Sequence, residues 1–250
     1  MGIVIKSERE IEVMRQAGRI VAAVLAILAK EVKVGMKTRE LDVIAEREIR
    51  ARGGVPSFKG YHGFPASLCV SINDEVVHGI PGDKVINEGD KVSLDLGAIY
   101  QGFQGDAAVT VVVGKAGAVA KALVQATEGA LYAGIEAARA GVHLGDVSAA
   151  IQHHAEACGF AVVREYTGHG IGRKMHEEPL IPNFGESGTG PVLRKGMALA
   201  LEPMLNAGNW PTRVGSDGWV VLTADGSLSA HFEHTIAITD DRAEILTTLA

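Results

Sequence analysis

The sequence predicts one α/β domain made of two similar halves, about residues 1–114 and 115–250. Three observations predict this fold class. Each half has helical periodicity first and strand-like alternation afterwards. Each half also contains a short amphipathic helix enclosed by glycines. Finally, Asp95 and Glu202 lie 107 residues apart, as do the glycines that precede them, Gly89 and Gly196. We interpret this pattern as an internal duplication about a pseudo-twofold axis, with no low-complexity linker between the halves.

The first half predicts two helices followed by strands. A capping box, Ser7-x-x-Glu10, begins a helix whose apolar residues recur at helical spacing as far as Leu28. Thr38 is placed to cap a second helix, which the glycines at 53 and 54 end. Strands are expected at 67–72, 91–99 and 106–113, because these segments alternate or are rich in β-branched residues.

The second half repeats this order. An alanine-rich helix is expected at about 119–140, and a second helix runs from Gly141 through Ile151 to Gly159. The carboxylates Asp106 and Glu233 are 127 residues apart instead of 107, which leaves room for a loop or hairpin around 210–219 in the second half.

Composition excludes several classes of protein. Hydrophobic residues make up 47% and charged residues 22%, as in a globular protein with a substantial core. The net charge of −6 argues against nucleic-acid binding. Two cysteines, Cys69 and Cys158, form neither a disulfide framework nor a cysteine-based zinc site. No signal peptide is visible, and the longest apolar run, 20–29, falls short of the roughly 20 residues that span a bilayer. We therefore expect a soluble, cytoplasmic protein.

Four carboxylates are expected to converge at the axis: Asp95 and Glu202 from equivalent strands, and Asp106 and Glu233 from the strands that follow. Alone, each is typical of a solvated strand face. Together they cannot all ionise in a dry cleft without a compensating cation. Two divalent metals about 3.5–4 Å apart satisfy them, with His169 of a Gly-His-Gly turn as the nitrogen ligand. Such a ligand set suits Mn²⁺, Fe²⁺, Co²⁺ or Zn²⁺.

The other histidines divide into groups. His78 and His176 are repeat mates directed at the same axis, which favours roles in the cleft. His153 and His154 lie on a predicted helix and are interpreted as a surface or half-buried pair. The remaining three show no ligand pattern. His143 and His231 are interpreted as structural, and His234 points to the opposite face of the strand from Glu233.

Several motifs together resemble the type I methionine aminopeptidases over nearly the whole chain. They are Leu94-Asp95 with Asp106, Gly168-His169-Gly170-Ile171-Gly172, His176-Glu177-Glu178-Pro179, Glu202-Pro203-Met204 and Glu233-His234-Thr235. Only 26 positions separate His176 from Glu202, so the long insertion of type II enzymes has no room. No N-terminal zinc-binding extension is visible, as in the short bacterial form. The resemblance implies a pita-bread fold, an antiparallel sheet in two pseudo-twofold halves covered by helices.

The resemblance also implies an activity, the removal of initiator methionine from nascent proteins whose second residue is small and uncharged. It implies that Asp95 binds one metal ion, that His169 and Glu202 bind the other, and that Asp106 and Glu233 bridge them. A bridging water activated by both ions is then the nucleophile, and Glu202 its general base. The catalytic histidines have separate roles: His78 contacts the scissile amide nitrogen, and His176 the carbonyl oxygen.

Methionine selectivity is expected from an apolar pocket, because a thioether offers shape and polarisability. The residues that match the family's pocket positions are Tyr61, Phe64, Cys69 and Trp219. One departure is Met175, which stands where family members commonly carry an aromatic residue. Asn73 and Ser229 match positions where the family can bind a monovalent cation through backbone oxygens.

Two alternatives compete with this hypothesis. A proline-specific peptidase shares the fold but usually carries an additional N-terminal domain. A non-catalytic binding protein could keep the scaffold, yet such relatives lose metal ligands and all five are present here. The expected partners are the N-termini of nascent polypeptides at the ribosome. We expect a monomer with no membrane contact and no direct recognition of nucleic acid.

Overall fold

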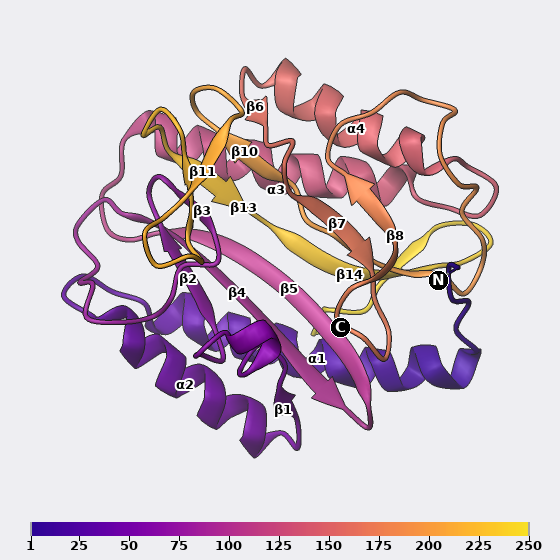
Figure 1. The fold of residues 1–250 in the computed structure, drawn as a ribbon, viewed down its shortest axis with the longest axis horizontal. Helices are drawn as coiled ribbons and strands as arrows, with labels where there is room; N and C mark the ends of the chain where they lie inside the picture. The colour runs from indigo at the N-terminus through magenta and orange to yellow at the C-terminus, as the bar shows by residue number, and fades with distance from the viewer. Residues whose placement is uncertain (1, 250) are drawn as a thin grey trace.

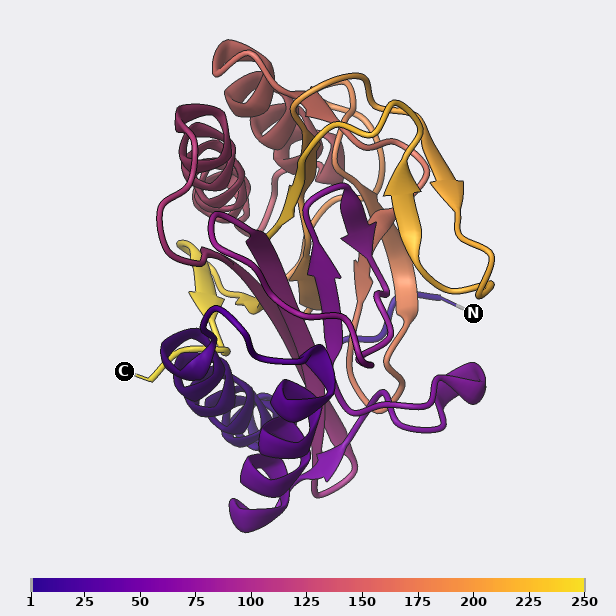
Figure 2. The same ribbon diagram turned by 90° about the vertical axis from the view of Figure 1, so that its left-hand side faces the viewer.

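The computed structural model describes residues 2–249, and it is a mixed α/β structure with antiparallel sheets (Figure 1). The helices are α1 (Glu8–Glu31), α2 (Thr38–Ala51), α3 (Ala118–Ala137) and α4 (Leu144–Ala157), with a short 3₁₀ helix, η1 (Tyr61–Gly63). All four long helices lie on one side of the sheet, and η1 and the hairpin of β11 (Thr212–Val214) and β12 (Val221–Thr223) lie on the other (Figure 2). No described helix is both long and apolar enough to cross a membrane.

The central sheet has nine strands and contains strands from both halves. Along its main path the order is β1 (Val55–Pro56), β4 (Lys91–Tyr100), β5 (Phe103–Val112), β14 (Glu233–Ile238), β9 (Ala198–Leu201), β7 (Thr167–Gly170) and β8 (Glu177–Pro182). Two further strands pair beside this path, β2 (Cys69–Ile72) with β4 and β15 (Ala243–Ile245) with β14. The halves meet where β5 pairs with β14, over only two positions: Glu233 opposite Ala108 and His234 opposite Ala107.

Two small sheets complete the fold. One has the order β13 (Ser229–His231), β10 (Met204–Asn206), β6 (Ala161–Val162), and the other has the order β11 (Thr212–Val214), β12 (Val221–Thr223), β3 (Glu75–Val77). The hairpin of β11 and β12 occupies the segment that the unequal carboxylate spacing predicted to be a loop or hairpin. It pairs with β3 of the first half through Val77 and Val221, so the insertion contributes to contacts between the halves.

The duplication is visible in matching local contacts. The residue before α2, Lys37, forms an isolated bridge with Val85, and the residue before α4, His143, forms one with Val192. An acidic side chain three residues later, Glu40 or Asp146, accepts a hydrogen bond from the backbone N–H of the residue before each helix. These repeated caps place the second helix of each half in the same way against the loop that leads into the sheet.

One helix cap differs from the prediction. The capping box of Ser7 and Glu10 is present at the start of α1, as expected. At α2, however, Thr38 is already helical and Lys37 is the N-cap. The Thr38 hydroxyl instead accepts a hydrogen bond from the Gly82 N–H at 2.8 Å, a contact with a loop 44 residues away. The prediction was wrong because a tertiary contact uses the oxygen that would have capped the helix.

The core follows the two halves. One cluster packs α1 and α2 against β2, β4 and β5, with Leu28, Leu41 and Leu94 fully buried. Another packs α3 and α4 against β9 and β14, with Leu123, Ile151 and Ile236 fully buried. Both clusters lie on the helical side of the sheet, which leaves the opposite face available for polar side chains.

Candidate active site

Three of the carboxylates are brought together by strand register. Asp95 of β4 lies opposite Ala108 of β5, and Ala108 lies opposite Glu233 of β14. Directly paired residues in antiparallel strands point to the same face, as do residues two positions apart on one strand. Asp106, two positions before Ala108, therefore shares the face of Asp95 and Glu233.

The same rule adds the two ligands of the second half. His169 of β7 lies opposite Ala200 of β9, and Thr235 of β14 lies opposite the same alanine. Glu202 follows Ala200 by two positions, and Glu233 precedes Thr235 by two. All five residues predicted to bind metal consequently lie on one face, across the junction of the two halves.

These side chains are close together and withdrawn from water. Asp106, His169 and Glu233 are 4%, 2% and 2% exposed, and each offers a ligand atom within 4.8 Å of the others. His169 Nε2 lies 3.5 Å from Glu202 Oε1. Three carboxylate oxygens, Asp95 Oδ1, Asp106 Oδ1 and Glu233 Oε1, are buried without a hydrogen-bond partner in the structure. Buried carboxylate oxygens are rarely left unpaired, so this site calls for a partner of positive charge.

The pKa shifts of these side chains also indicate that the site requires positive charge. Burial raises the pKa of Asp95 to about 7. Burial first, and then the neighbouring carboxylates, raise the pKa of Asp106, Glu202 and Glu233 well above the ordinary value. Burial lowers the pKa of His169 to about 3, so its imidazole is neutral and can act as a ligand. Divalent cations would reverse the carboxylate shifts, because opposite charge favours the ionised form. The residues present therefore fit divalent metal ions.

His169 is oriented for this role by its own turn. Its Nδ1 lies 2.9 Å from the Gly170 carbonyl oxygen, so Nδ1 carries the hydrogen and Nε2 keeps a free lone pair toward the carboxylates. The glycines on either side are required by packing. A Cβ on Gly168 would lie 2.4 Å from the Ala200 carbonyl oxygen, and one on Gly170 would lie 2.2 Å from the Glu178 carbonyl oxygen.

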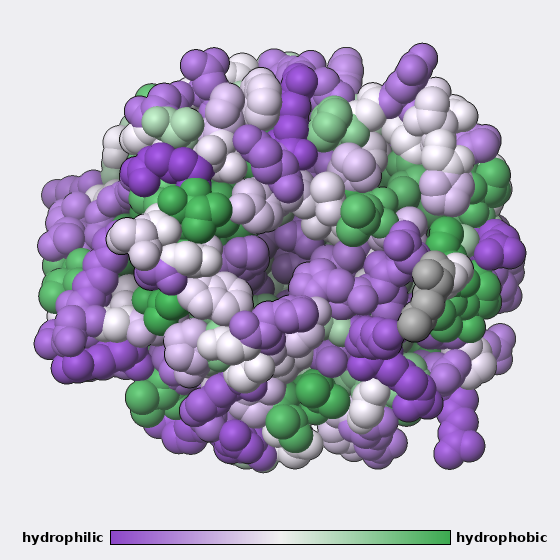
Figure 3. Space-filling view, viewed as in Figure 1, coloured by the Kyte–Doolittle hydropathy of each residue, from purple (hydrophilic) through white to green (hydrophobic). Residues whose placement is uncertain are grey.

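A cavity of about 220 Å³ lies over the carboxylates, and the open face is hollowed near its middle (Figure 3). All the residues predicted for the site line it; they are Tyr61, Phe64, Cys69, His78, Asp95, Asp106, His169, His176, Glu202, Trp219 and Glu233. Met175, whose departure from the family pattern bears on the pocket, lines it as well, together with two residues that had not been assigned to it, Phe58 and His62. Phe64 and Trp219 meet edge to face at 5.1 Å, which gives the cavity an aromatic wall.

The two predicted catalytic histidines lie beside the ligand cluster. The rings of His176 and His169 are 4.3 Å apart. Tyr61 Oη lies 2.8 Å from His176 Nδ1. Burial raises the pKa of Tyr61, so the phenol keeps its proton, and we assign it as the donor of a hydrogen bond to Nδ1 of a neutral His176. The N–H of His176 is then on Nε2. Burial lowers the pKa of His78 to about 4, so this histidine is neutral as well.

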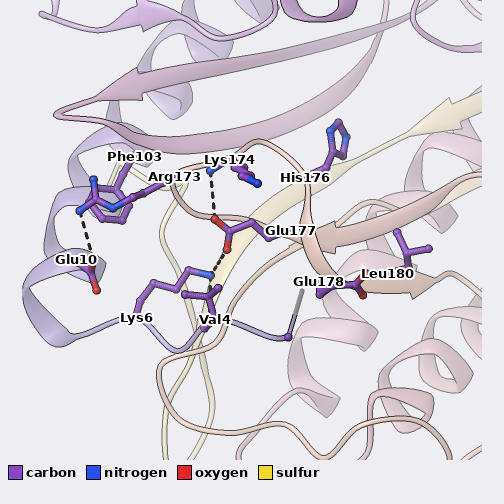
Figure 4. A pocket seen from close by; sticks show the side chains of 11 residues that line it. Val4, Lys6, Glu10, Phe103, Arg173, Lys174, His176, Glu177, Glu178 and Leu180 are labelled. Atoms are coloured by element: carbon purple, nitrogen blue, oxygen red, sulfur yellow. Dashed lines mark hydrogen bonds and ion pairs between the residues drawn. The ribbon is translucent and has the colours of Figure 1, made fainter.

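A second cavity, about 480 Å³ in volume, adjoins the site through His176 (Figure 4). The His176 ring is turned away from the side chains of Val4 and Lys6 that line this cavity (Figure 4). Lys6 Nζ lies 2.7 Å from Glu177 Oε2, and the Lys174 N–H donates to Glu177 Oε1 at 3.2 Å. The N-terminal segment thus braces the loop that carries His176.

Two residues near the site had been given no part in it. His231 was interpreted as structural, yet its Nε2 lies 3.9 Å from Glu202 Oε2 and has no hydrogen-bond partner in the structure. His62 lines the cavity, and its charge helps to lower the pKa of His176 after burial, the larger cause. A period-two count back from Glu233 would have put His231 on the ligand face.

The other assigned residues lie as follows. His234 points away from the ligands and its Nδ1 lies 2.8 Å from Thr247 Oγ1. His153 is exposed on α4 and His154 is half-buried. Asn73 and Ser229 are adjacent, and the Ser229 N–H donates to the Asn73 carbonyl oxygen at 3.0 Å.

The model of metallopeptidase family M24 matches residues 12–240. The chain is 50% identical to methionine aminopeptidase 1 of Bacillus subtilis, over 98% of this chain and 99% of the relative. The chain belongs to metallopeptidase family M24. Within this M24 family it groups with the bacterial methionine aminopeptidases, being also 50% identical to that of Aquifex aeolicus over the full length of both chains. The expected family and the enzyme class, an aminopeptidase hydrolase, are confirmed.

Solved structures of the M24 family confirm the pita-bread fold. The crystal structure of methionine aminopeptidase from Thermotoga maritima superimposes with a TM-score of 0.98 at 49% identity, covering 99% of this chain and all of that one. Prolidase from Pyrococcus furiosus superimposes with a TM-score of 0.79 at 24% identity, covering 98% of this chain but 65% of that one. The prolidase likeness shows the shared fold alone.

Proposed function

We propose that the chain removes N-terminal methionine from polypeptides whose second residue is small and uncharged. The observation that carries the proposal is a set of four carboxylates, three of them buried and Glu202 partly buried, that lies with His169 on one sheet face beneath a cavity with an aromatic wall. Four such carboxylates require cations, and the cavity above them is apolar enough to accept a thioether side chain.

The metal site that we propose is dinuclear. Asp95 would hold one ion, His169 and Glu202 the other, and Asp106 and Glu233 would contact both. Cobalt, manganese, iron and zinc all suit oxygen ligands with one imidazole. When bound, such ions would lower the pKa of a water molecule and so supply a nucleophile at neutral pH.

The protein's own groups complete the reaction. Glu202 accepts the proton of the attacking water, since its carboxylate lies among the proposed ligands and faces His169 and His231 on its two oxygens. His176, with its hydrogen on Nε2, donates to the oxyanion that develops on the carbonyl. His78 interacts with the amide nitrogen of the bond that breaks. Because both histidines are neutral, neither adds a positive charge beside the cations.

The pocket supports methionine as the side chain in the first position. Phe64, Trp219 and Cys69 form one apolar cluster at the cavity. Met175 is 3% exposed and packs beside Gly97, where an added Cβ would lie 2.8 Å from its Cε. A flexible methionine in place of an aromatic ring keeps this wall apolar and adaptable, so the departure at this position alters the shape of the pocket rather than its character.

We further propose that the enzyme acts as a monomer in the cytoplasm on nascent chains at the ribosome, without contacting membrane or recognising nucleic-acid sequence. The N-terminus of a nascent chain is the form in which initiator methionine is available to an exopeptidase. A monovalent cation held by backbone oxygens of Asn73 and Ser229 stays a prediction.

The test compares three peptides with protein loaded with Mn²⁺ or Co²⁺. Met-Ala-Ser should release methionine, Met-Lys-Ser should stay nearly intact, and an Xaa-Pro dipeptide should not be cleaved. Equal cleavage of the first two peptides would refute the specificity, and cleavage of the third alone would assign a proline-specific peptidase. Metal analysis of protein purified without added ions identifies the resident metal and should give two ions per chain.

A further inference from the structure

Lys91, the first residue of β4, is 0% exposed and the largest of the fully buried side chains. Its Nζ lies 3.2 Å from the Glu75 carbonyl oxygen, 3.4 Å from the Ser71 carbonyl oxygen and 3.3 Å from Ser93 Oγ. A protonated amine has three hydrogens and no acceptor site, so it matches three acceptors. The proposed reaction assigns this buried charge no part.

No carboxylate within residues 2–249 forms an ion pair with Lys91, although several are near. Glu75 Oε1 pairs with Lys84 at 2.7 Å, and Asp90 accepts from Asn73 Nδ2 and from the Asn87 N–H. The cation is therefore held by neutral oxygens, two carbonyls and one hydroxyl. Carbonyl oxygens in such a cage are the groups that replace the hydration shell of potassium in channels. The oxygen atoms around the Lys91 ammonium are thus of the kind that bind a monovalent ion.

The cage belongs to a polar row next to the metal ligands. Ser71, Ser93 and Thr110 are directly paired across β2, β4 and β5. Each lies two positions from the row of Cys69, Asp95 and Ala108, and therefore on the same face. Lys91, two positions before Ser93, extends that face by one further row.

Hydrogen bonds link the cage to two groups of the site. Ser93 Oγ lies 2.8 Å from Thr110 Oγ1, which donates to the His231 carbonyl oxygen at 2.6 Å. His231 in turn faces Glu202. On the other side, Ser71 Oγ accepts from the Gly79 N–H at 3.2 Å and so holds the turn that presents His78. The buried Lys91 ammonium is thus linked through hydrogen bonds to the backbone beside His78 and at His231.

We propose that Lys91 is a positioning residue whose ammonium serves as a built-in monovalent cation, filling an oxygen cage that orders the Ser71–Ser93–Thr110 row beneath His78 and His231. The chain then needs no free potassium or sodium at this place. Without the ammonium, the same oxygens form a site of the right chemistry for K⁺ or Na⁺.

Burial is the largest influence on this group and lowers the pKa of Lys91 to about 7, while Glu75, Asp74 and Asp90 act in the opposite direction and Lys84 adds to the lowering. The experiment is therefore done at about pH 6, where the amine is protonated. The variant is Lys91→Met, which keeps an unbranched apolar stem and removes the charge. The matched control is Lys84→Met, which removes a half-exposed charge from the same neighbourhood.

Thermal unfolding is measured for metal-free protein in choline chloride, NaCl and KCl at one ionic strength. Wild type and Lys84→Met should unfold at the same temperature in all three salts. The Tm of Lys91→Met should be lower in choline chloride and rise by roughly 3–6 °C in KCl or NaCl, as expected when a cation is present at about ten times its Kd. A Lys91→Met protein that folds and responds to no salt would overturn the proposal.

Kinetics with metal-loaded protein form the second arm, which rests on the proposed function. With Met-Ala-Ser, kcat of Lys91→Met should fall by about tenfold or more in choline chloride with KM little changed, and should recover in the cation that raises the Tm. If the variant does not fold, the response of the wild-type protein to the three salts tests the proposal by itself. Activation of wild type by K⁺ over choline, or a rise in its Tm, would mean that the cation site lies elsewhere. The Tm arm stands even if Met-Ala-Ser is not a substrate.

Discussion

His231 Nε2 lies 3.9 Å from Glu202 Oε2, while His169 Nε2 lies 3.5 Å from the other oxygen of the same carboxylate. The proposed general base is thus flanked by two buried imidazoles. Burial lowers the pKa of His231 to about 3, with the charges of His78 and Lys91 acting in the same direction. His231 is neutral at pH 7 and can hold Glu202 in place without neutralising it.

Replacing His231 by alanine should therefore reduce kcat more than it changes KM. We expect a loss of about 10–100-fold, as is typical when a group supporting a metal ligand is removed. Steady-state kinetics with Met-Ala-Ser measure it, and His153→Ala, on the exposed side of α4, is the control. Equal kinetics in the two variants would show that His231 does not support Glu202.

Replacing Tyr61 by phenylalanine should test the orientation of His176. The variant keeps the ring that lines the cavity and loses the hydroxyl that donates to Nδ1. One such hydrogen bond contributes about 1 kcal/mol, so kcat should fall roughly fivefold with KM nearly constant. A change confined to KM would instead mean that the hydroxyl contacts the substrate.

Replacing His169 by alanine should remove the nitrogen ligand. We expect the variant to lose at least one metal ion per chain, by elemental analysis, and to have no measurable turnover. The His153→Ala control should keep wild-type metal content and activity. Full metal content in His169→Ala would mean that this histidine is not a ligand.

The stability of metal-free protein should depend on pH through Asp95. Its folded pKa is about 7, against an unfolded value of about 3.9. The contribution of neutral Asp95 is therefore fully present below about pH 4 and is lost as the pH rises through about 7. In Asp95→Asn this loss is absent, so the Tm of the variant should rise relative to wild type by several degrees between pH 4 and 8.

Both proteins contain the same histidines and Lys91, so subtracting one curve from the other leaves the effect of Asp95, which includes its influence on the pKa of Asp106, Glu202 and Glu233. Each kcal/mol moves the Tm of a chain of this size by roughly 2–4 °C. Saturating Mn²⁺ should make the Tm of wild type higher than that of Asp95→Asn at pH 8, because only wild type keeps the complete set of proposed ligands. A difference in Tm that is independent of pH would contradict the buried, neutral carboxyl.

The helices and strands, and the set of carboxylates that meet on one face, could be predicted from the sequence because both depend on local patterns; their role as metal ligands stays a prediction. Alternation placed Asp95 on a strand, and the duplication linked it to Glu202. The sequence-based predictions failed where contacts between residues far apart in the chain determine the structure. Thr38 accepts a hydrogen bond from Gly82 instead of capping α2, and His231, the last residue of β13, lies near Glu202 only because the folded chain brings them together. Lys91 begins an alternating strand, and nothing in that pattern predicts its burial, which depends on the packing of β2 against β4.

The two halves of the molecule share only two ladder positions between β5 and β14, and the proposed ligands lie on both sides of that line. Divalent ions bound there would link the two halves where few backbone hydrogen bonds join them. Removal of these ions by a chelator should therefore speed amide hydrogen exchange in β5 and β14 first. It should also make the chain near the junction of the two halves more accessible to proteases. The metal supply of the cell would then govern how long each copy of the protein survives as well as how fast it turns over.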